Sequence, residues 1–268
     1  MLPPPPRPRR AMNDQNYRPP VHRFLSLPLR PMGAAYTGDV FRRWRPIGKN
    51  EREDFNTVLT ATLTLLALII GFSFSMAVSR YDQRKNNEEA EANAIGTEYA
   101  RADLLPTDDG TKLRELLRRY VNQRILFYHG DDSQISEAAS EAQKLQAELW
   151  SRVVQAAAAQ STPVAALAVS GMNDVLNSQG YTQAAWGNRI PAAAWILMGL
   201  IAIVCNLLLG YRERSAGLLV LLVVPIVASI AFFLIADIDS PRGGVIRVIP
   251  HNLIGVSQSM NARQNASP

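Results

Sequence analysis

Three long stretches without a charged side chain set the strongest limit on how this chain can fold. Residues 58–78, 190–210 and 216–236 are each 21 residues long and contain no Asp, Glu, Lys, Arg or His. An α-helix rises about 1.5 Å per residue, so about 20 residues cross the hydrocarbon core of a bilayer. Helices buried in a soluble protein usually keep a polar stripe, which these stretches lack. The sequence therefore predicts an integral membrane protein with about three transmembrane helices.

The regions around these spans differ in composition. We expect a Pro/Arg-rich tail (1–55), a first transmembrane helix (56–78), a helical extramembrane domain (79–189), two further transmembrane helices (190–210 and 216–236) and a C-terminal tail (237–268). The N-terminal tail holds ten arginines, one lysine and five acidic residues. Its prolines fix φ and lack an amide donor, which favours polyproline II or disorder beside anionic lipid headgroups. Because no aromatic platform accompanies the basic charge, we expect no nucleic-acid partner.

The extramembrane segment predicts helices throughout, and the whole chain is predicted to be all-α. The first span continues into it without a turn signal as far as about Leu105, where Pro106 ends the helix. The next two helices are expected over 112–129 and 133–159. Each carries an apolar stripe at spacings of three and four, formed by Leu113, Leu117, Tyr120, Val121 and Ile125, and by Ile135, Ala138, Ala142, Leu145, Leu149 and Val153. A further helix starts at Pro163 and is expected to end in a loop near Gly180.

Charged residues follow the first span along the same helix. Glu88, Glu89 and Glu91 lie close to Arg84 and Lys85, at the distances of three and four residues that bring side chains together on a helix surface. We therefore expect these residues on a solvated face, as exposed ion-pair partners.

The residues that carry enzyme chemistry are sparse. The three histidines are far apart, and the single cysteine, Cys205, lies inside the second apolar stretch. No metalloprotease, CxxC or phosphate-loop motif occurs, so we expect neither catalysis nor a cofactor. Asp237 and Asp239 form an acidic pair at the membrane edge. The pair fits capping, orientation or ion pairing, or alternatively a cation, and two carboxylates alone do not predict a metal site.

One face of the first span carries Thr64, Leu68 and Phe72, four residues apart. Ser75 and Ser79 continue this face toward water. A face that is apolar in the middle and hydroxyl-rich at its ends suits the wall of a narrow pore that gates by dewetting. Small hydroxyl residues are equally typical of ordinary contacts between membrane helices, so pore and packing interpretations both stay open.

The orientation in the membrane depends on the basic residues near the ends of the spans. Seven lie on the side of the N-terminus and six on the other side. An Arg-rich tail is costly to translocate, which favours an N-terminus inside and a helical domain outside.

Four segments in this order resemble the bestrophin-like domain family of bacterial membrane proteins: GFSFSMAVSRYDQRK, EANAIGTEYARADLLP, LRELLRRYV and FFLIADIDSPRGGVIRV. The resemblance covers roughly residues 55–250. It implies a remote similarity to bestrophins, which are pentameric anion channels. The Gly71-Phe72 and Arg80-Tyr81 pairs have the bestrophin separation, and the channel's apolar neck positions fall on Thr64, Leu68 and Phe72.

The resemblance also has departures. Thr64 is polar where the neck would be apolar, and Asp82, Glu88 and Glu89 replace aromatic and basic residues. The acidic calcium clasp of animal bestrophins has no counterpart, and the proline- and arginine-rich tail replaces a further N-terminal span. The family also implies a cytosolic helical domain, opposite to the orientation inferred from charge.

Two functions follow as expectations. The resemblance implies a homo-oligomeric anion channel in the inner (plasma) membrane of a bacterium, in contact with lipids and anions. The alternative is a non-conducting scaffold or sensor that assembles through its helical domain. A helix that leaves the membrane without a break fits both.

Overall fold

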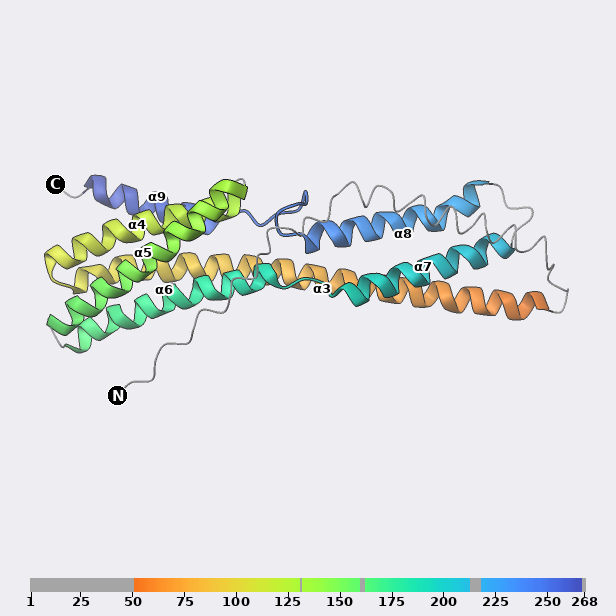
Figure 1. Ribbon diagram of the computed structural model, residues 1–268, viewed down its shortest axis with the longest axis horizontal. Coiled ribbons are helices and arrows are strands. Elements are labelled where there is room, and N and C mark those ends of the chain that lie inside the picture. Colours follow the sequence, from red (N-terminus) through yellow and green to blue (C-terminus); the bar gives the residue numbers. More distant parts are fainter. Residues whose placement is uncertain (1–50, 131, 160–161, 213–217, 267–268) are drawn as a thin grey trace. The chain divides into compact units, whose positions relative to one another are not determined.

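The computed structural model describes residues 51–266 apart from 131, 160–161 and 213–217, and every regular element in this part of the chain is a helix (Figure 1). In chain order these are α3 (Glu51–Arg101), the 3-10 helix η2 (Ala102–Leu104), α4 (Thr107–His129), α5 (Asp132–Ala159), α6 (Pro163–Gly187), α7 (Ala192–Arg212), α8 (Leu218–Asp239) and α9 (His251–Ala266). Three helical stretches, on α3, on α6–α7 and on α8, are long and apolar enough to cross a membrane. The prediction of an all-α membrane protein with about three transmembrane helices is confirmed.

Most of the expected N-terminal tail, residues 1–50, lies outside the described residues. The last five residues of that tail are helical, because α3 already begins at Glu51. Three of these five residues, Glu51, Glu53 and Asp54, are acidic. Negative charge is favourable at the positive end of a helix dipole, which explains the earlier start.

The described chain forms two compact units. The membrane unit comprises α3 as far as Phe72, together with Ala192–Ile235, which holds α7 and most of α8. Its core joins Leu66 of α3 to Met198 and Cys205 of α7 and Phe232 of α8, all of them buried. Among the described residues of the unit, these contacts leave the other side of α3 exposed.

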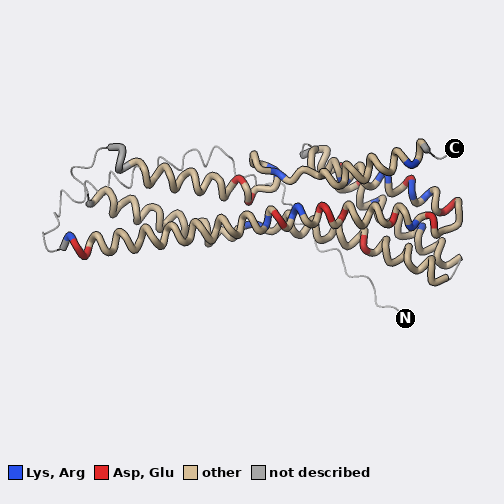
Figure 2. The backbone as a smooth tube through the Cα atoms, turned by 180° about the vertical axis from the view of Figure 1, so that it is seen from behind, with Lys and Arg blue, Asp and Glu red and all other residues tan. Residues whose placement is uncertain are grey.

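The helical unit comprises Ser73–Pro191 and Ala236–Pro268. Its core contains Leu113, Leu117, Tyr120, Val121, Ala142, Leu145, Leu149, Val153, Met172 and Val175. Both predicted apolar stripes are therefore buried against one another, with Ile125 and Ile135 at the margins. Charged residues are spread along the helices of this unit, whereas α7 carries none before its last residue (Figure 2).

The α3–α4 connection is tight because of one proline and one glycine. Leu105 is extended, with φ −94° and ψ 163°, as expected for the residue that precedes Pro106. Gly110 lies in the first turn of α4, directly against the carbonyl oxygen of Ala102, where a Cβ atom would overlap it. Glycine at this position lets the two backbones approach each other.

The start of α6 agrees with the sequence, but the loop expected near Gly180 is wrong. Thr162 caps α6 by accepting a hydrogen bond from Ala165 N at 3.1 Å, and Pro163 follows as the first helical residue. The helix then continues through Gly180 to Gly187. A glycine inside a helix costs only about 1 kcal/mol relative to alanine, and the buried Ser178 and Thr182 on either side show that packing holds the helix together here.

The C-terminal segment that was expected as a tail contains a helix with a buried face. Leu253 and Met260 of α9 are 0% and 1% exposed and belong to the same core as α4. Tyr99 of α3 donates a hydrogen bond to Met260 O at 3.3 Å. Leu253 and Met260 are seven residues apart and so lie on the same face of the helix. Because most other residues of this segment are polar, this apolar face was not predicted from the sequence.

If α9 is an integral part of the core, Leu253→Ala should lower the free energy of unfolding by about 2–5 kcal/mol, the usual cost of emptying a buried leucine site. Ile249→Ala is the matched control, because Ile249 precedes α9 and is 51% exposed. Denaturation of both purified variants, followed by far-UV circular dichroism, measures the difference. Equal stability of the two variants would show that α9 does not stabilise the fold.

Candidate functional site

The outer face of α3, opposite its contacts with α7 and α8, carries Thr64, Leu68 and Phe72. All three are exposed, Leu68 at 52% and Phe72 at 62%. The Thr64 hydroxyl donates to the Thr60 carbonyl at 2.9 Å, so its hydrogen is bonded within the helix. The structure thus places the three candidate pore residues on one exposed face of α3, away from the described helices of the membrane unit.

In the helical unit the same side of α3 becomes polar. A shallow hollow follows the helix and is lined by Ser75, Val78, Ser79, Asp82, Gln83, Asn86 and Asn87. All of these residues belong to α3, so the described part of the unit supplies only one wall of the hollow. The lining offers hydroxyl and amide groups and one carboxylate to whatever lies opposite.

The inner side of α3 in the helical unit carries a row of buried charges, which we term the buried charge seam: Arg84, Glu88, Glu91 and Glu98. Their exposure is 1% or less. The prediction that Glu88 and Glu91 are solvated ion-pair partners is therefore wrong, although Glu89 is exposed. The seam shares its helical spacing with Ala77, Ile95 and Ala102, which are buried as well. Charged residues that share a helical face with buried apolar residues are themselves expected to be buried, and this pattern is the sequence signal that could have identified the seam.

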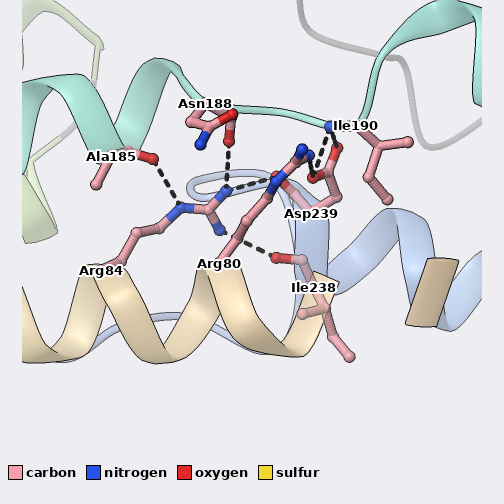
Figure 3. A network of polar contacts seen from close by, with 7 residues as sticks. All are labelled: Arg80, Arg84, Ala185, Asn188, Ile190, Ile238 and Asp239. Carbon is pink, nitrogen blue, oxygen red and sulfur yellow. Dashed lines mark hydrogen bonds and ion pairs between the residues drawn. The ribbon is translucent and has the colours of Figure 1, made fainter. Parts of the chain in front are cut away.

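Arg84 lies where the ends of α6 and α8 meet α3 (Figure 3). Its guanidinium donates to Ala185 O and Asn188 O, both at 3.4 Å, and to Ile238 O and Asp239 O, both at 3.1 Å. The last carbonyls of a helix have no partner inside it and form the negative end of the helix dipole. One buried cation thus satisfies carbonyls at the ends of two helices.

Asp239 and Asp237 act separately at the end of α8. Asp239 accepts hydrogen bonds from Ile190 N at 3.1 and 3.2 Å and from Arg80 at 3.3 Å. Asp237 accepts from the backbone amides of residues 245 and 246 at 2.7 and 2.9 Å. Gly244 packs against Asp237 so closely that a Cβ atom would lie 2.7 Å from Oδ1.

These contacts match capping and ion pairing, one of the two interpretations left open for the acidic pair. Each carboxylate is directed at backbone amides, and no group of three or more potential metal-ligating side chains occurs in the part of the chain that the structure describes. The two acids fix the connection before α7 and the loop after α8.

Glu88 and Glu91 connect α3 to other helices of the unit. Glu88 accepts from Leu253 N at 2.9 Å and from Asn252 Nδ2 at 2.8 Å, at the start of α9. Glu91 pairs with buried Arg124 of α4 and accepts from Thr182 Oγ1 of α6 at 3.0 Å. Burial acts to lower the pKa of Arg124, but the charge and hydrogen bonds of Glu91 outweigh it and raise that pKa.

Comparisons with known proteins address the family and the fold. A family model described as a Bestrophin-like domain matches residues 36–253. No curated protein is significantly similar in sequence to the chain. The resemblance inferred from the four sequence segments is therefore confirmed by the family model, across most of the chain.

Several solved structures share the fold. A crystal structure of a bacterial bestrophin homologue from Klebsiella pneumoniae, carrying a mutation, matches with a TM-score of 0.65 and 12% identity, over 92% of this chain and 97% of that chain. Another structure of this homologue matches with a TM-score of 0.63 and 13% identity, over 92% and 99%. A further mutant structure gives 0.61 and 15%, over 89% and 98%. At such low identity these likenesses show the fold alone.

Removing the Arg84 guanidinium should destabilise the helical unit strongly. In Arg84→Met the carbonyls at the ends of α6 and α8 lose their donor, and an unsatisfied buried polar group costs about 1–3 kcal/mol. Lys85→Met is the matched control, since Lys85 is the next residue and is exposed. Denaturation followed by far-UV circular dichroism should show a large decrease in the free energy of unfolding for Arg84→Met and little change for Lys85→Met. Similar small losses for both would mean that Arg84 does not hold these helix ends.

Proposed function

The chain belongs to the bestrophin-like domain family, and from this premise we propose that it forms an oligomeric anion channel in which the outer face of α3 lines the pore. The observation that carries the proposal is the exposure of Leu68 and Phe72. Large apolar side chains on a side of α3 that the described helices of its unit leave exposed suit an apolar constriction. In this arrangement other copies of the chain supply the opposite walls.

The polar hollow on α3 supports the same assignment. Among the described residues its lining comes from a single helix, and in the proposed oligomer α3 of further copies encloses the passage. The hydroxyl and amide groups of Ser75, Ser79 and Asn86 can solvate an ion of either sign. Arg80 offers less to an anion than the sequence indicates, because Asp239 pairs with it. Under this proposal, anion preference depends on neutral polar groups.

A non-conducting scaffold or sensor is the second candidate, and Asp82 favours it. This acid lines the hollow, where its negative charge would oppose the entry of anions. The exposed apolar residues would then be contacts between subunits or with lipid. The helical unit would assemble the complex, and the channel and scaffold proposals differ in whether ions pass.

We place the protein in the inner membrane of a bacterium as a homo-oligomer in contact with lipids. Three apolar helices support membrane insertion, and the solved structures of similar fold come from a bacterial homologue. For the orientation, the basic residues of the tail favour an N-terminus inside, whereas the family resemblance favours a cytosolic helical unit. Labelling of a cysteine introduced at exposed Asn93, tested from each side of the membrane, distinguishes the two.

Phe72→Ala should enlarge the unitary anion current of purified protein in a planar bilayer, because a smaller side chain widens and wets an apolar constriction. Phe74→Ala is the matched control. Phe74 is also exposed, but two residues along a helix turn its side chain by about 200°, away from the outer face. Leu68→Ala should act like Phe72→Ala. Absence of current from folded, oligomeric wild-type protein, across pH and calcium concentration, would exclude the channel and leave the scaffold.

A further inference from the structure

Glu98 is the member of the buried charge seam whose carboxylate has no hydrogen-bond partner. The residue is 0% exposed, and neither Oε1 nor Oε2 receives a hydrogen bond from the described residues. The other two glutamates of the seam each accept several. An unpaired carboxylate in the core is costly, and such groups usually become neutral by taking up a proton.

The carboxyl group of Glu98 is packed against α6. Gly171 lies directly against Oε2, and a Cβ atom at this residue would overlap it. The Arg101 side chain borders the same space, because its Nη1 and its Cδ also lie against that Cβ position, and its Nη1 donates to Leu167 O at 3.2 Å. The glycine thus makes room for a carboxyl group between α3 and α6 without supplying a donor for it.

The charges around Glu98 have opposing effects. The pKa of Glu98 is raised to about 8: burial is the largest cause, Arg101 on the same helix acts to lower the pKa, and Asp174 of α6 acts to raise it. Glu98 lies twenty residues beyond Val78, roughly 30 Å along a helix, so it is outside the apolar span. Its protonation is therefore governed by the helical unit.

We propose that Glu98 is a proton-binding site of the helical unit. The protonated side chain closes the contact between α3 and α6 at Gly171, and loss of the proton opens this contact to water. The ligand is the proton itself. This site does not depend on the proposed channel function, because infrared spectra and thermal stability report on Glu98 whether or not the protein conducts ions.

The sign of the pH effect follows from linkage. An ordinary glutamate has a pKa of 4.5, and the folded-state pKa of Glu98 is about 8, so the folded state holds an extra proton between these values. The contribution of Glu98 to stability is therefore greatest below about pH 4.5 and declines as the pH rises toward about 8, above which it is lost. An ion-paired carboxylate would have the opposite dependence.

Infrared difference spectroscopy of the full chain in detergent tests the protonation directly. Raising the pH from about 6 to about 10 should remove a carbonyl band of a protonated carboxyl group, and this change should be missing in Glu98→Gln. Glu89→Gln, an exposed neighbour on the same helix, should keep it. A wild-type spectrum without this band, or an unchanged band in Glu98→Gln, would overturn the proposal.

Stability and hydrogen exchange test the consequence. The melting temperature of the wild type should fall from about pH 6 to about pH 9 more than that of Glu98→Gln, and Asp174→Asn should move the fall to lower pH. After correction for intrinsic rates, amides of α6 near Gly171 should exchange faster at the higher pH only in proteins that retain Glu98. Equal pH profiles for wild type and Glu98→Gln would contradict the inferred site.

Discussion

A charge inside the helical unit is stable only where another part of the chain supplies compensating groups, and this requirement governs how the unit is assembled. Arg84 is the clearest case, because carbonyls at the ends of α6 and α8 converge on one guanidinium (Figure 3). Bringing an arginine out of water without such partners would cost several kcal/mol. The last carbonyls of a helix, in turn, have no donor within the helix itself. The carbonyls therefore compensate the buried charge of Arg84, and Arg84 supplies the hydrogen-bond donors that the helix ends lack.

Two of the seam glutamates, Glu88 and Glu91, extend this principle along α3. Glu88 holds the start of α9 and Glu91 holds α4 and α6, so segments distant in sequence are each fixed to one helix by a specific charged group. Apolar contacts alone are tolerant of small slides between helices, whereas a hydrogen-bonded charge has one satisfactory position. The apolar core provides most of the driving force, and the seam determines which turn of α3 faces which partner.

The parts of the fold that sequence reasoning predicted correctly depend on local pattern. The charge-free stretches and the stripes of α4 and α5 follow directly from helix length and periodicity. Glu91 escaped prediction because its partner Arg124 lies on another helix, and periodicity along one helix cannot show whether a charge faces solvent or a distant counter-charge. Gly180 was misjudged because packing on both sides outweighs a weak local preference. Helical spacing placed Thr64, Leu68 and Phe72 on one face of α3, but spacing along one helix does not show what that face contacts.

The continuity of α3 has a consequence for how the length of this protein can vary. Phe72 and Arg84 lie on one helix without an interruption, so the angle between their faces depends on the number of residues between them. Inserting or deleting a single residue there would turn one face by about 100° relative to the other. A change of seven residues would return it to within about 20°. Residues 73–83 are therefore expected to tolerate substitution far better than a change in their number, and natural length variants of this segment should differ by whole pairs of turns.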